Sequence, residues 1–491
     1  MQSDCIYFAK RIYVLCETEN ILNFSLGFAL LESGSVNRKN EVNVMMKNIV
    51  DMVFGGLSYW MFGYGMSYGT SEGTNPFFAV GSYFVDTSET NMGYLYATYI
   101  FQLSFASTAT TIVSGAVAER FNFTAYCVYS FLNTFVYCLP AGWIWGEHGF
   151  LNHLGIVDIA GCCPVHLVGG ASALVAVMMI GPRRGRYDRQ KISPTIQSPT
   201  NAMLGMFVLW WGWLGFNCGS TFGVTGAKWK YAARSAITTI NASVGGGINS
   251  LIFSSIYFKK RFLISNLING ILSSLVAITA GCVLYSPWEA LFIGIISSFL
   301  TNFLTPALDK LKIDDPVGAV PVHLAGSVWG MVAVGLFVEK DSVLKLSKGR
   351  AGVFQKGGFY LLGVQVLGII VVGLWSSITT YILLRVINLV LPLRMSAEDE
   401  DIGADSVEHD IKHFTSMQNM PFSSTTSLPF RTSSILPVGE LQNVITANAR
   451  RSNPENYKFE VLTTALFESI PRGELSAKYH IKTDELTDFI L

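Results

Sequence analysis

The residues of this chain best suited to chemistry are two histidines in nearly identical apolar segments. Residues 164–169 read PVHLVG and residues 321–326 read PVHLAG, which places His166 and His323 in matching frames. An imidazole at bilayer depth is costly unless it faces a partner or a cavity, so it indicates a functional site. Two such segments predict a duplicated architecture whose halves meet around one pore.

A facing pair of neutral imidazoles has a restricted chemistry. The two rings can share one hydrogen bond while each keeps its other nitrogen free for a molecule in the pore, and either ring can carry a proton. Such a pair suits a small, uncharged, hydrogen-bonding molecule or a proton relay. It does not suit bare sodium or potassium, which require rings of oxygen ligands. The alternative is structural: His166 and His323 tie the two halves together.

Each histidine follows an aspartate eight positions upstream, Asp158 in the first segment and Asp315 in the second. A carboxylate at the start of a helix accepts hydrogen bonds from free backbone N–H groups and favours the positive end of the helix dipole. We expect both aspartates to have this structural role, with direct contact to a substrate as the alternative.

Aromatic and hydroxyl side chains in other apolar stretches form a second candidate site. Phe101 and Phe105 are one helical turn apart, Phe216 precedes Ser220 by four residues, and Trp145 ends an apolar stretch. Converging aromatic faces and a hydroxyl would attract a small cation through cation–π forces and a hydrogen bond. The spacing alone is more typical of an interfacial aromatic belt and of ordinary packing.

The elements that must position these residues are membrane-spanning helices. Half of the 491 residues are hydrophobic, 14% are charged, and the mean hydropathy is +0.40. Apolar stretches near the length of a bilayer crossing, roughly 20 residues, recur up to about residue 393. We predict an all-α polytopic membrane protein with eleven transmembrane helices. Their expected starts lie near Ile21, Asn48, Met92, Thr124, Cys163, Ala202, Ala236, Phe262, Trp288, Ala319 and Gly358.

The positions of the two histidines predict how the halves are related. They lie 157 residues apart, with five predicted spans between one and the other. An odd number of spans turns the second half upside down, which gives an inverted five-plus-five repeat. In such repeats a shared site lies near the midplane of the membrane.

Charge predicts the orientation and the domain boundary. Loop 182–199 and residues 259–261 are basic, whereas loop 69–91 has acidic residues and no lysine or arginine. The positive-inside rule then places the N-terminus outside and the C-terminus in the cytoplasm. We expect a transmembrane domain over residues 1–393 and a cytoplasmic, partly disordered regulatory tail over residues 394–491.

Composition also argues against other functions. A net charge of zero without a basic patch argues against a nucleic-acid partner. The eight cysteines show no metal-ligand spacing, and no nucleophile–base set appears outside the histidines. We therefore expect no enzyme, no metal and no cofactor.

Several motifs, taken together, resemble the Amt family of ammonium transporters, the relatives of the Rhesus proteins. The resemblance covers about residues 26–409. The motifs are GFALLESG at 27–34, RKN at 38–40, GAVAER at 115–120, DIAGC at 158–162 continuing through His166, Gly169 and Gly170 to IGPR at 180–183, WLGFN at 213–217 and DDP at 314–316.

The resemblance implies a homotrimer in the plasma membrane, in contact with lipid, with one pore in each subunit. It implies ammonium or ammonia as substrate, with methylammonium as an analogue. It places Phe101, Trp145 and Ser220 at an outer recruitment site, Phe105 and Phe216 in a gate of two stacked rings, and His166 and His323 in the pore, with Asp158 as a support of the outer site.

On this interpretation ammonium loses its proton near the phenylalanine gate, and ammonia crosses along the histidines with the proton following. Two alternatives stay open. The chain could be an electroneutral ammonia channel of the Rhesus kind, or an ammonium sensor that signals through its tail.

Overall fold

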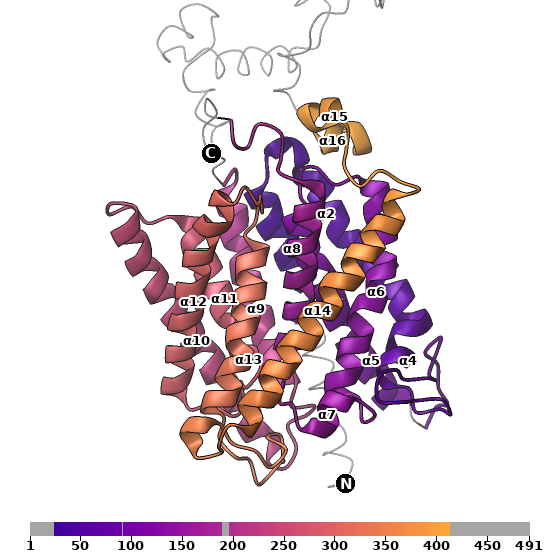
Figure 1. Ribbon diagram of the computed structural model, residues 1–491, viewed down its shortest axis with the longest axis vertical. Coiled ribbons are helices and arrows are strands. Elements are labelled where there is room, and N and C mark those ends of the chain that lie inside the picture. The colour runs from indigo at the N-terminus through magenta and orange to yellow at the C-terminus, as the bar shows by residue number, and fades with distance from the viewer. Residues whose placement is uncertain (1–23, 91, 189–195, 413–491) are drawn as a thin grey trace, which may run out of the picture. The chain divides into compact units, whose positions relative to one another are not determined.

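The computed structural model describes residues 24–90, 92–188 and 196–412, which form a bundle of helices packed side by side (Figure 1). Among these residues the regular elements are helical, apart from two isolated β-bridges. The predicted all-α class is therefore confirmed.

The helices follow one another with short connections. After helical residues 24–35 and a 3₁₀ turn at Arg38–Asn40, α2 (Glu41–Val50) continues through two π-helical turns and α3 (Gly56–Ser58) into α4 (Tyr64–Tyr68). The later long helices are α5 (Met92–Ala116), α6 (Phe123–Trp145), α8 (Val168–Ile180), α9 (Pro199–Gly219), α10 (Lys228–Tyr257), α11 (Ile264–Thr279), α12 (Pro287–Lys310), α13 (Gly326–Phe337) and α14 (Tyr360–Asn388). Short helix α7 spans Phe150–Leu154.

Four helical stretches among the described residues are long and apolar enough to cross a membrane by length and composition: 123–154, 162–180, 287–310 and 360–388. Other helices carry buried hydroxyl groups that lower their hydropathy while bonding internally. Thr238 of α10, for example, donates its hydroxyl to the carbonyl of Cys282 at 2.6 Å. Such satisfied polar groups are compatible with helix packing in a membrane. The full set of eleven crossings stays a prediction.

Two of the predicted span starts lie further along the chain than the start of the corresponding helix. α2 begins at Glu41 rather than near Asn48, and α10 begins at Lys228 rather than near Ala236. Two charged residues near this start are paired inside the bundle. Buried Lys47 donates to the carbonyl of Phe121 at 3.0 Å, and buried Asp51 accepts from the hydroxyl of Tyr126 at 2.8 Å.

Small residues let the helices of the second half approach closely. α10, α11 and α12 lie next to one another along one side of the bundle (Figure 1). Ser298 of α12 donates to the carbonyl of Gly246 of α10 at 3.0 Å, and Ser274 of α11 donates to the carbonyl of Gly294 of α12 at 2.9 Å. α14 packs against α8, α13 and α6, which joins the two halves.

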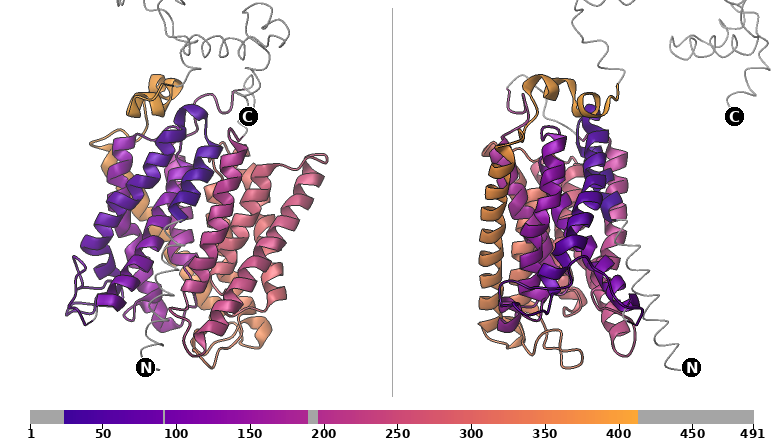
Figure 2. Two further views of the ribbon diagram at one scale, coloured as in Figure 1. Left: turned by 180° about the vertical axis from the view of Figure 1, so that it is seen from behind. Right: turned by 90° about the vertical axis from the view of Figure 1, so that its right-hand side faces the viewer.

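Two short helices after α14 are tied to one end of the bundle. α15 (Ala397–Ile402) packs against α16 (Ala404–His409), which lies beside the start of α2 (Figure 2). Buried Asp405 accepts from the backbone N–H of Asn43 at 2.7 Å and from that of Val42 at 3.1 Å. The first part of the predicted tail is thus ordered against the helices. The rest, from residue 413, lies outside the described residues, as does the predicted first-span start at Ile21.

Candidate functional site

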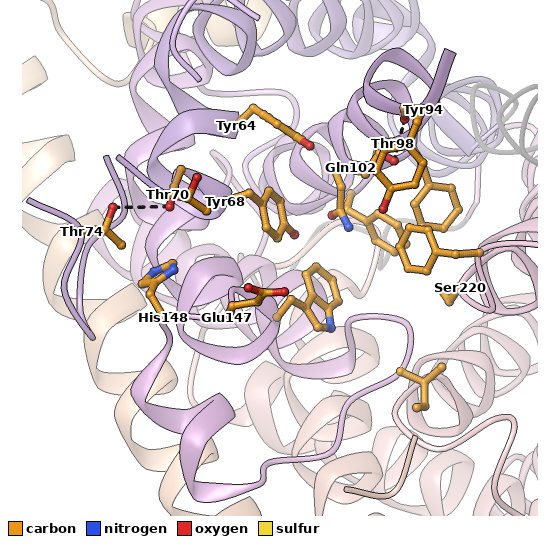
Figure 3. A pocket seen from close by; sticks show the side chains of 16 residues that line it. Tyr64, Tyr68, Thr70, Thr74, Tyr94, Thr98, Gln102, Glu147, His148 and Ser220 are labelled. Atoms are coloured by element: carbon orange, nitrogen blue, oxygen red, sulfur yellow. Dashed lines mark hydrogen bonds between the residues drawn. The ribbon is translucent and has the colours of Figure 1, made fainter. Parts of the chain in front are cut away.

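A cavity of about 710 Å³ opens at the end of the bundle where α6 terminates. We call it the Trp145 cavity. Phe101, Phe105, Trp145 and Ser220 all line it, so the structure brings together the aromatic and hydroxyl residues that were singled out in the sequence. They come from α5, from the last residue of α6 and from the end of α9. Figure 3 shows the cavity with Ser220 on one side of it.

The aromatic rings of this cavity contact one another edge to face. The ring centroids of Phe101 and Phe105 are 4.9 Å apart, and those of Phe105 and Trp145 are 5.5 Å apart. Trp145 is fixed because its indole N–H donates to the carbonyl of Asp158 at 2.8 Å. Ser220 donates its hydroxyl to the carbonyl of Phe216 at 2.8 Å, which leaves its oxygen lone pairs as acceptors.

Two buried phenylalanine rings separate the Trp145 cavity from the histidines. The centroids of Phe105 and Phe216 are 4.2 Å apart with 56° between the ring planes. The two rings are therefore in contact and tilted to one another. Their role as a gate stays a prediction. Phe216 also stacks on Phe24, with the ring centroids 5.2 Å apart and 21° between the ring planes.

The two histidines meet as the repeated segments predicted. Nδ1 of His166 and Nδ1 of His323 are 3.2 Å apart, a hydrogen-bond distance, and both side chains are buried. The indole of Trp213 stacks on His166 at 5.2 Å and is held by a 2.8 Å hydrogen bond to the hydroxyl of Thr279. Nε2 of His166 has no hydrogen-bond partner among the described residues, so it can serve a molecule in the passage.

The local structure around the histidines is also repeated. Each histidine lies on a π-helical turn. His166 lies on Cys162–Leu167, before α8, and His323 lies on Pro321–Ala325, before α13. Asp158 accepts from the backbone N–H groups of Gly161, Cys162 and Cys163 at 2.6 to 3.0 Å. Asp315 accepts from those of Gly318 and Val320 at 2.9 and 2.7 Å. Both carboxylates are thus occupied by the free N–H groups of a helix start.

Further space continues from the histidines toward the other end of the bundle. A small cavity of about 20 Å³ is lined by Phe28, Glu32 and His323. A larger cavity of about 640 Å³, the Asp314 cavity, follows it, and Gly318 lines both. Asp158 lies beside Trp145, whereas Asp315 lines the Asp314 cavity. The two histidine segments therefore start toward opposite ends of the bundle. The inverted repeat itself stays a prediction.

Several residues of the site were not identified from the sequence. Tyr64, Tyr68, Gln102, Glu147 and His148 line the Trp145 cavity. Two signals were available: Glu147 and His148 lie two and three residues after Trp145, and Tyr64 and Tyr68 are one helical turn apart. Neither signal shows that these residues share a cavity, because α4, α5 and the loop after α6 meet only in the folded chain.

Cavities at two ends of a helical bundle, with two buried phenylalanine rings and a histidine pair between them, are typical of a membrane channel or transporter. The model of the Ammonium Transporter Family matches residues 12–414, and the chain belongs to this family, whose members are multi-pass membrane proteins. The resemblance in the motifs is thereby confirmed.

Individual relatives agree with this assignment. The chain is 45% identical to the Caenorhabditis elegans protein named "Putative ammonium transporter 3", over 83% of this chain and 61% of that one. It thus spans less than two thirds of that relative. It is 41% identical to "Putative ammonium transporter 2" of the same organism, over 83% of this chain and 82% of that one.

A solved structure described as "Sensor Amt Protein" is 30% identical with a TM-score of 0.76, and the match covers 83% of this chain and 100% of that chain. The crystal structure of Saccharomyces cerevisiae Mep2 is 25% identical with a TM-score of 0.71, and the match covers 80% of this chain and 88% of that chain.

Proposed function

We propose that the chain takes up ammonium at the Trp145 cavity, removes a proton and conducts ammonia along His166 and His323. The observation that carries this proposal is the order of the elements along one path. An aromatic cavity is followed by two phenylalanine rings in contact, by a hydrogen-bonded histidine pair and by further cavities.

Recruitment of the cation follows from the aromatic faces and the serine. Phe101 and Trp145 offer the negative faces of their rings, and the oxygen of Ser220 can accept an N–H hydrogen bond. Potassium shares the cation–π attraction but cannot donate a hydrogen bond. The site therefore favours ammonium and methylammonium over potassium.

Deprotonation follows from the next stretch of the passage. Phe105 and Phe216 are fully packed, so a charged ion between them would lose its hydration without replacement, at a cost of several kcal/mol or more. Neutral ammonia avoids this cost and can exchange hydrogen bonds with the imidazoles. The released proton follows along the histidine pair and rejoins ammonia beyond it, so that the net charge moved is one per ammonium.

The assembly and orientation belong to the same proposal. We infer a homotrimer in the plasma membrane, with a lipid-facing surface, the Trp145 cavity outside and the Asp314 cavity in the cytoplasm. Arginines at the latter end support this orientation by the positive-inside rule: Arg183 and Arg186 line the Asp314 cavity. The helices α15 and α16 lie with the cytoplasmic side.

A second candidate function is ammonium sensing with little flux. It is favoured by the likeness to a structure described as "Sensor Amt Protein" and by ordered tail helices fixed to the bundle. An electroneutral ammonia channel of the Rhesus kind is the third. The cation-binding residues Trp145 and Ser220 argue against it, because a gas channel has less need of them.

Membrane current under voltage clamp separates these functions. Cells expressing the chain receive external ammonium, and wild type is compared with Trp145→Leu, with His166→Asp/His323→Glu and with the control Trp229→Leu. Trp229 is 55% exposed on the first turn of α10, outside the site. We expect a saturable inward current that Trp145→Leu weakens about ten-fold, the loss of roughly 1.4 kcal/mol of binding. The double histidine variant should lose the current or pass potassium.

Two outcomes would contradict electrogenic ammonium transport. An ammonium-driven pH change without current would overturn the electrogenic step and leave electroneutral ammonia conduction. Surface-expressed wild type with neither current nor pH change would overturn transport and leave the sensor.

A further inference from the structure

We propose that Glu32 holds the transported proton on the inner side of the histidine pair and returns it to ammonia there. The proposal rests on the ammonium transport proposed above, in which ammonia and the proton recombine beyond the histidines. It assigns this recombination to one carboxyl group. Glu32 lies in the helical residues 24–35, and its side chain is buried inside the bundle.

A small cavity brings Glu32 to the second histidine. Glu32 and His323 both line the cavity of about 20 Å³ that follows the histidine pair. Among the described residues on its wall, those with polar side chains are Glu32, Asn269 and His323. This volume holds about one molecule of the size of water or ammonia, and a buried water needs about two to four polar partners. The polar groups on this wall therefore suit one such molecule.

The carboxyl group of Glu32 has one oxygen that the protein occupies and one that it leaves free. Oε2 accepts from Nδ2 of Asn48 at 3.0 Å and from the hydroxyl of Ser114 at 2.9 Å. Oε1 accepts no hydrogen bond from the described residues and keeps a small accessible surface. The carboxyl carbon lies beside Gly115, which also lines the small cavity: a Cβ atom on Gly115 would be 3.3 Å from it. Oε1 is therefore the oxygen that a molecule in this cavity can reach.

His323 offers a nitrogen to the same cavity. Its Nδ1 lies 3.2 Å from Nδ1 of His166, so its Nε2 is the nitrogen that remains for a molecule in the small cavity. The ring of Phe28 lies beside this imidazole, with the ring centroids 6.1 Å apart, and it lines the cavity as well. A proton that has crossed the histidine pair leaves it from this Nε2.

The charges around Glu32 favour a bound proton. Among the described residues, the charged side chains that act on Glu32 are those of Asp51 and Lys47, and all three are buried. A hydrogen-bonded chain through Asn48 joins the two carboxyl groups, because the hydroxyl of Thr111 lies 2.9 Å from Oδ1 of Asn48 and 2.9 Å from Oδ2 of Asp51. Two carboxylates and one ammonium group leave one negative charge, which is costly inside an apolar bundle. One proton cancels it, and Glu32 is the carboxyl of this pair that lines the cavity.

The transfer balances as a sequence of proton steps. A proton passes from Nε2 of His323 through a water in the small cavity to Oε1 of Glu32, so an N–H bond breaks and an O–H bond forms. Ammonia then replaces the water and accepts the proton, so the O–H bond breaks and a new N–H bond forms. The ammonium ion leaves toward the Asp314 cavity, which shares Gly318 with the small cavity, and Glu32 is again a carboxylate.

The test measures the charge moved per ammonium nitrogen taken up, from membrane current and uptake of isotope-labelled ammonium in the same cells. Glu32→Gln keeps an oxygen acceptor for Asn48 and Ser114 but cannot carry the proton. We expect the ratio of charge to nitrogen to fall at least about ten-fold in Glu32→Gln, because proton transfer by a positioned group contributes more than this. Glu32→Asp keeps a carboxyl group and should retain a ratio within about three-fold of wild type.

Glu289→Gln is the matched control. Glu289 is a buried glutamate of α12 that accepts from the backbone N–H of Ser286 at 2.8 Å and from the side-chain amide of Gln355 at 2.9 Å, and it lines none of the three cavities. This variant should keep the wild-type ratio. An unchanged ratio in Glu32→Gln would overturn the role of Glu32 and leave the transport proposal intact. Equal losses of current and uptake in Glu32→Gln would also overturn it, because they would assign a purely structural role.

A spectroscopic measurement separates this proposal from the transport proposal. The infrared C=O band of protonated carboxyl groups is recorded for purified wild type, Glu32→Gln and Glu289→Gln at neutral pH. We expect a component that Glu32→Gln removes, that Glu289→Gln keeps and that shifts in heavy water, because the cavity lets the proton exchange. This result supports a proton on Glu32 even if the wild type carries no current. A spectrum that Glu32→Gln leaves unchanged overturns the proposal even if transport is intact.

Discussion

At the scale of single residues, Asp314 shows how a charge is stabilised at one end of the passage. Burial raises the pKa of this carboxyl, but the hydrogen bonds from Arg183 and the positive charges of Arg183 and Arg120 together outweigh burial and lower the pKa to about 2. Arg183 donates from Nε and Nη2 to the two carboxylate oxygens at 2.8 and 2.9 Å, and from its backbone N–H at 2.9 Å. Asp314 lies in the loop between α12 and the second histidine segment, so it helps to fix where that segment begins.

This lowered pKa predicts a pH dependence of stability. A carboxyl whose pKa is lower in the folded state stabilises the fold above its unfolded value, near 4, and loses this contribution as the pH falls toward 2. The contribution is roughly 2 kcal/mol. We expect the difference in melting temperature between wild type and Asp314→Asn to shrink from pH 5 to pH 2 in detergent solution. A constant difference over this range would contradict the ion pair with Arg183.

Asp158 contacts both a helix start and Trp145. Its carboxylate accepts three backbone N–H groups, and its backbone carbonyl accepts the indole N–H of Trp145. These contacts explain how the residue could affect cation binding through Trp145. They favour the structural interpretation over direct contact with the substrate.

At the scale of elements, the distance between the histidines depends on how two helices cross. Gly170 of α8 lies against the backbone of the second histidine segment. A Cβ atom on it would be 2.5 Å from the backbone nitrogen of Leu324 and 2.9 Å from the carbonyl carbon of His323. Contacts below 3 Å with backbone cannot be relieved by a side-chain rotation, so glycine is required here.

Gly170→Ala should therefore push the two histidine segments apart. We expect at least a ten-fold loss of ammonium current and a lower melting temperature, because overpacking a tight contact typically costs 1 to 3 kcal/mol. Gly373→Ala on α14 is the matched control, since a Cβ atom there meets nothing within 4 Å. Wild-type current and melting temperature in Gly170→Ala would show that the crossing is looser than this geometry.

At the scale of the whole molecule, the ends of the bundle differ in chemistry. The Trp145 cavity is aromatic and has Glu147 in its wall, whereas Arg183, Arg186 and Asp314 line the cavity at the other end. The helices after α14 lie at the end of the bundle that holds the Asp314 cavity. There the backbone N–H of Arg184 donates to the carboxylate of Glu400 at 2.6 Å. The tail helices thus contact the loop that follows α8 and the start of α2.

Asp405 joins these tail helices to the start of α2, so its replacement should change the dynamics of both segments. Asp405→Ala leaves the N–H groups of Val42 and Asn43 without their acceptor, at a cost of about 1 to 3 kcal/mol. We expect faster amide hydrogen exchange across residues 397–409 and at the start of α2. Glu398→Ala, an exposed change on α15, should leave exchange unaltered. Equal exchange in both variants would show that Asp405 does not hold these helices.

The sequence by itself determined the class of the protein and the centre of the site. Apolar composition fixes a helical membrane protein, because only internally bonded helices or closed barrels satisfy the backbone in lipid. The repeated segments around His166 and His323 predicted that the rings would meet, and each aspartate eight residues upstream was correctly expected at a helix start.

Only the tertiary structure decided the rest. It set the tilt of Phe105 against Phe216 and the stacking of Phe24 on Phe216. It began α2 at Glu41, seven residues before the predicted span start near Asn48, and paired buried Lys47 with the carbonyl of Phe121. It also brought Tyr68, Gln102 and His148 into one cavity. The physical reason is the same in each case. A local sequence pattern predicts the helix in which it lies, whereas contacts between distant segments depend on how all the helices pack.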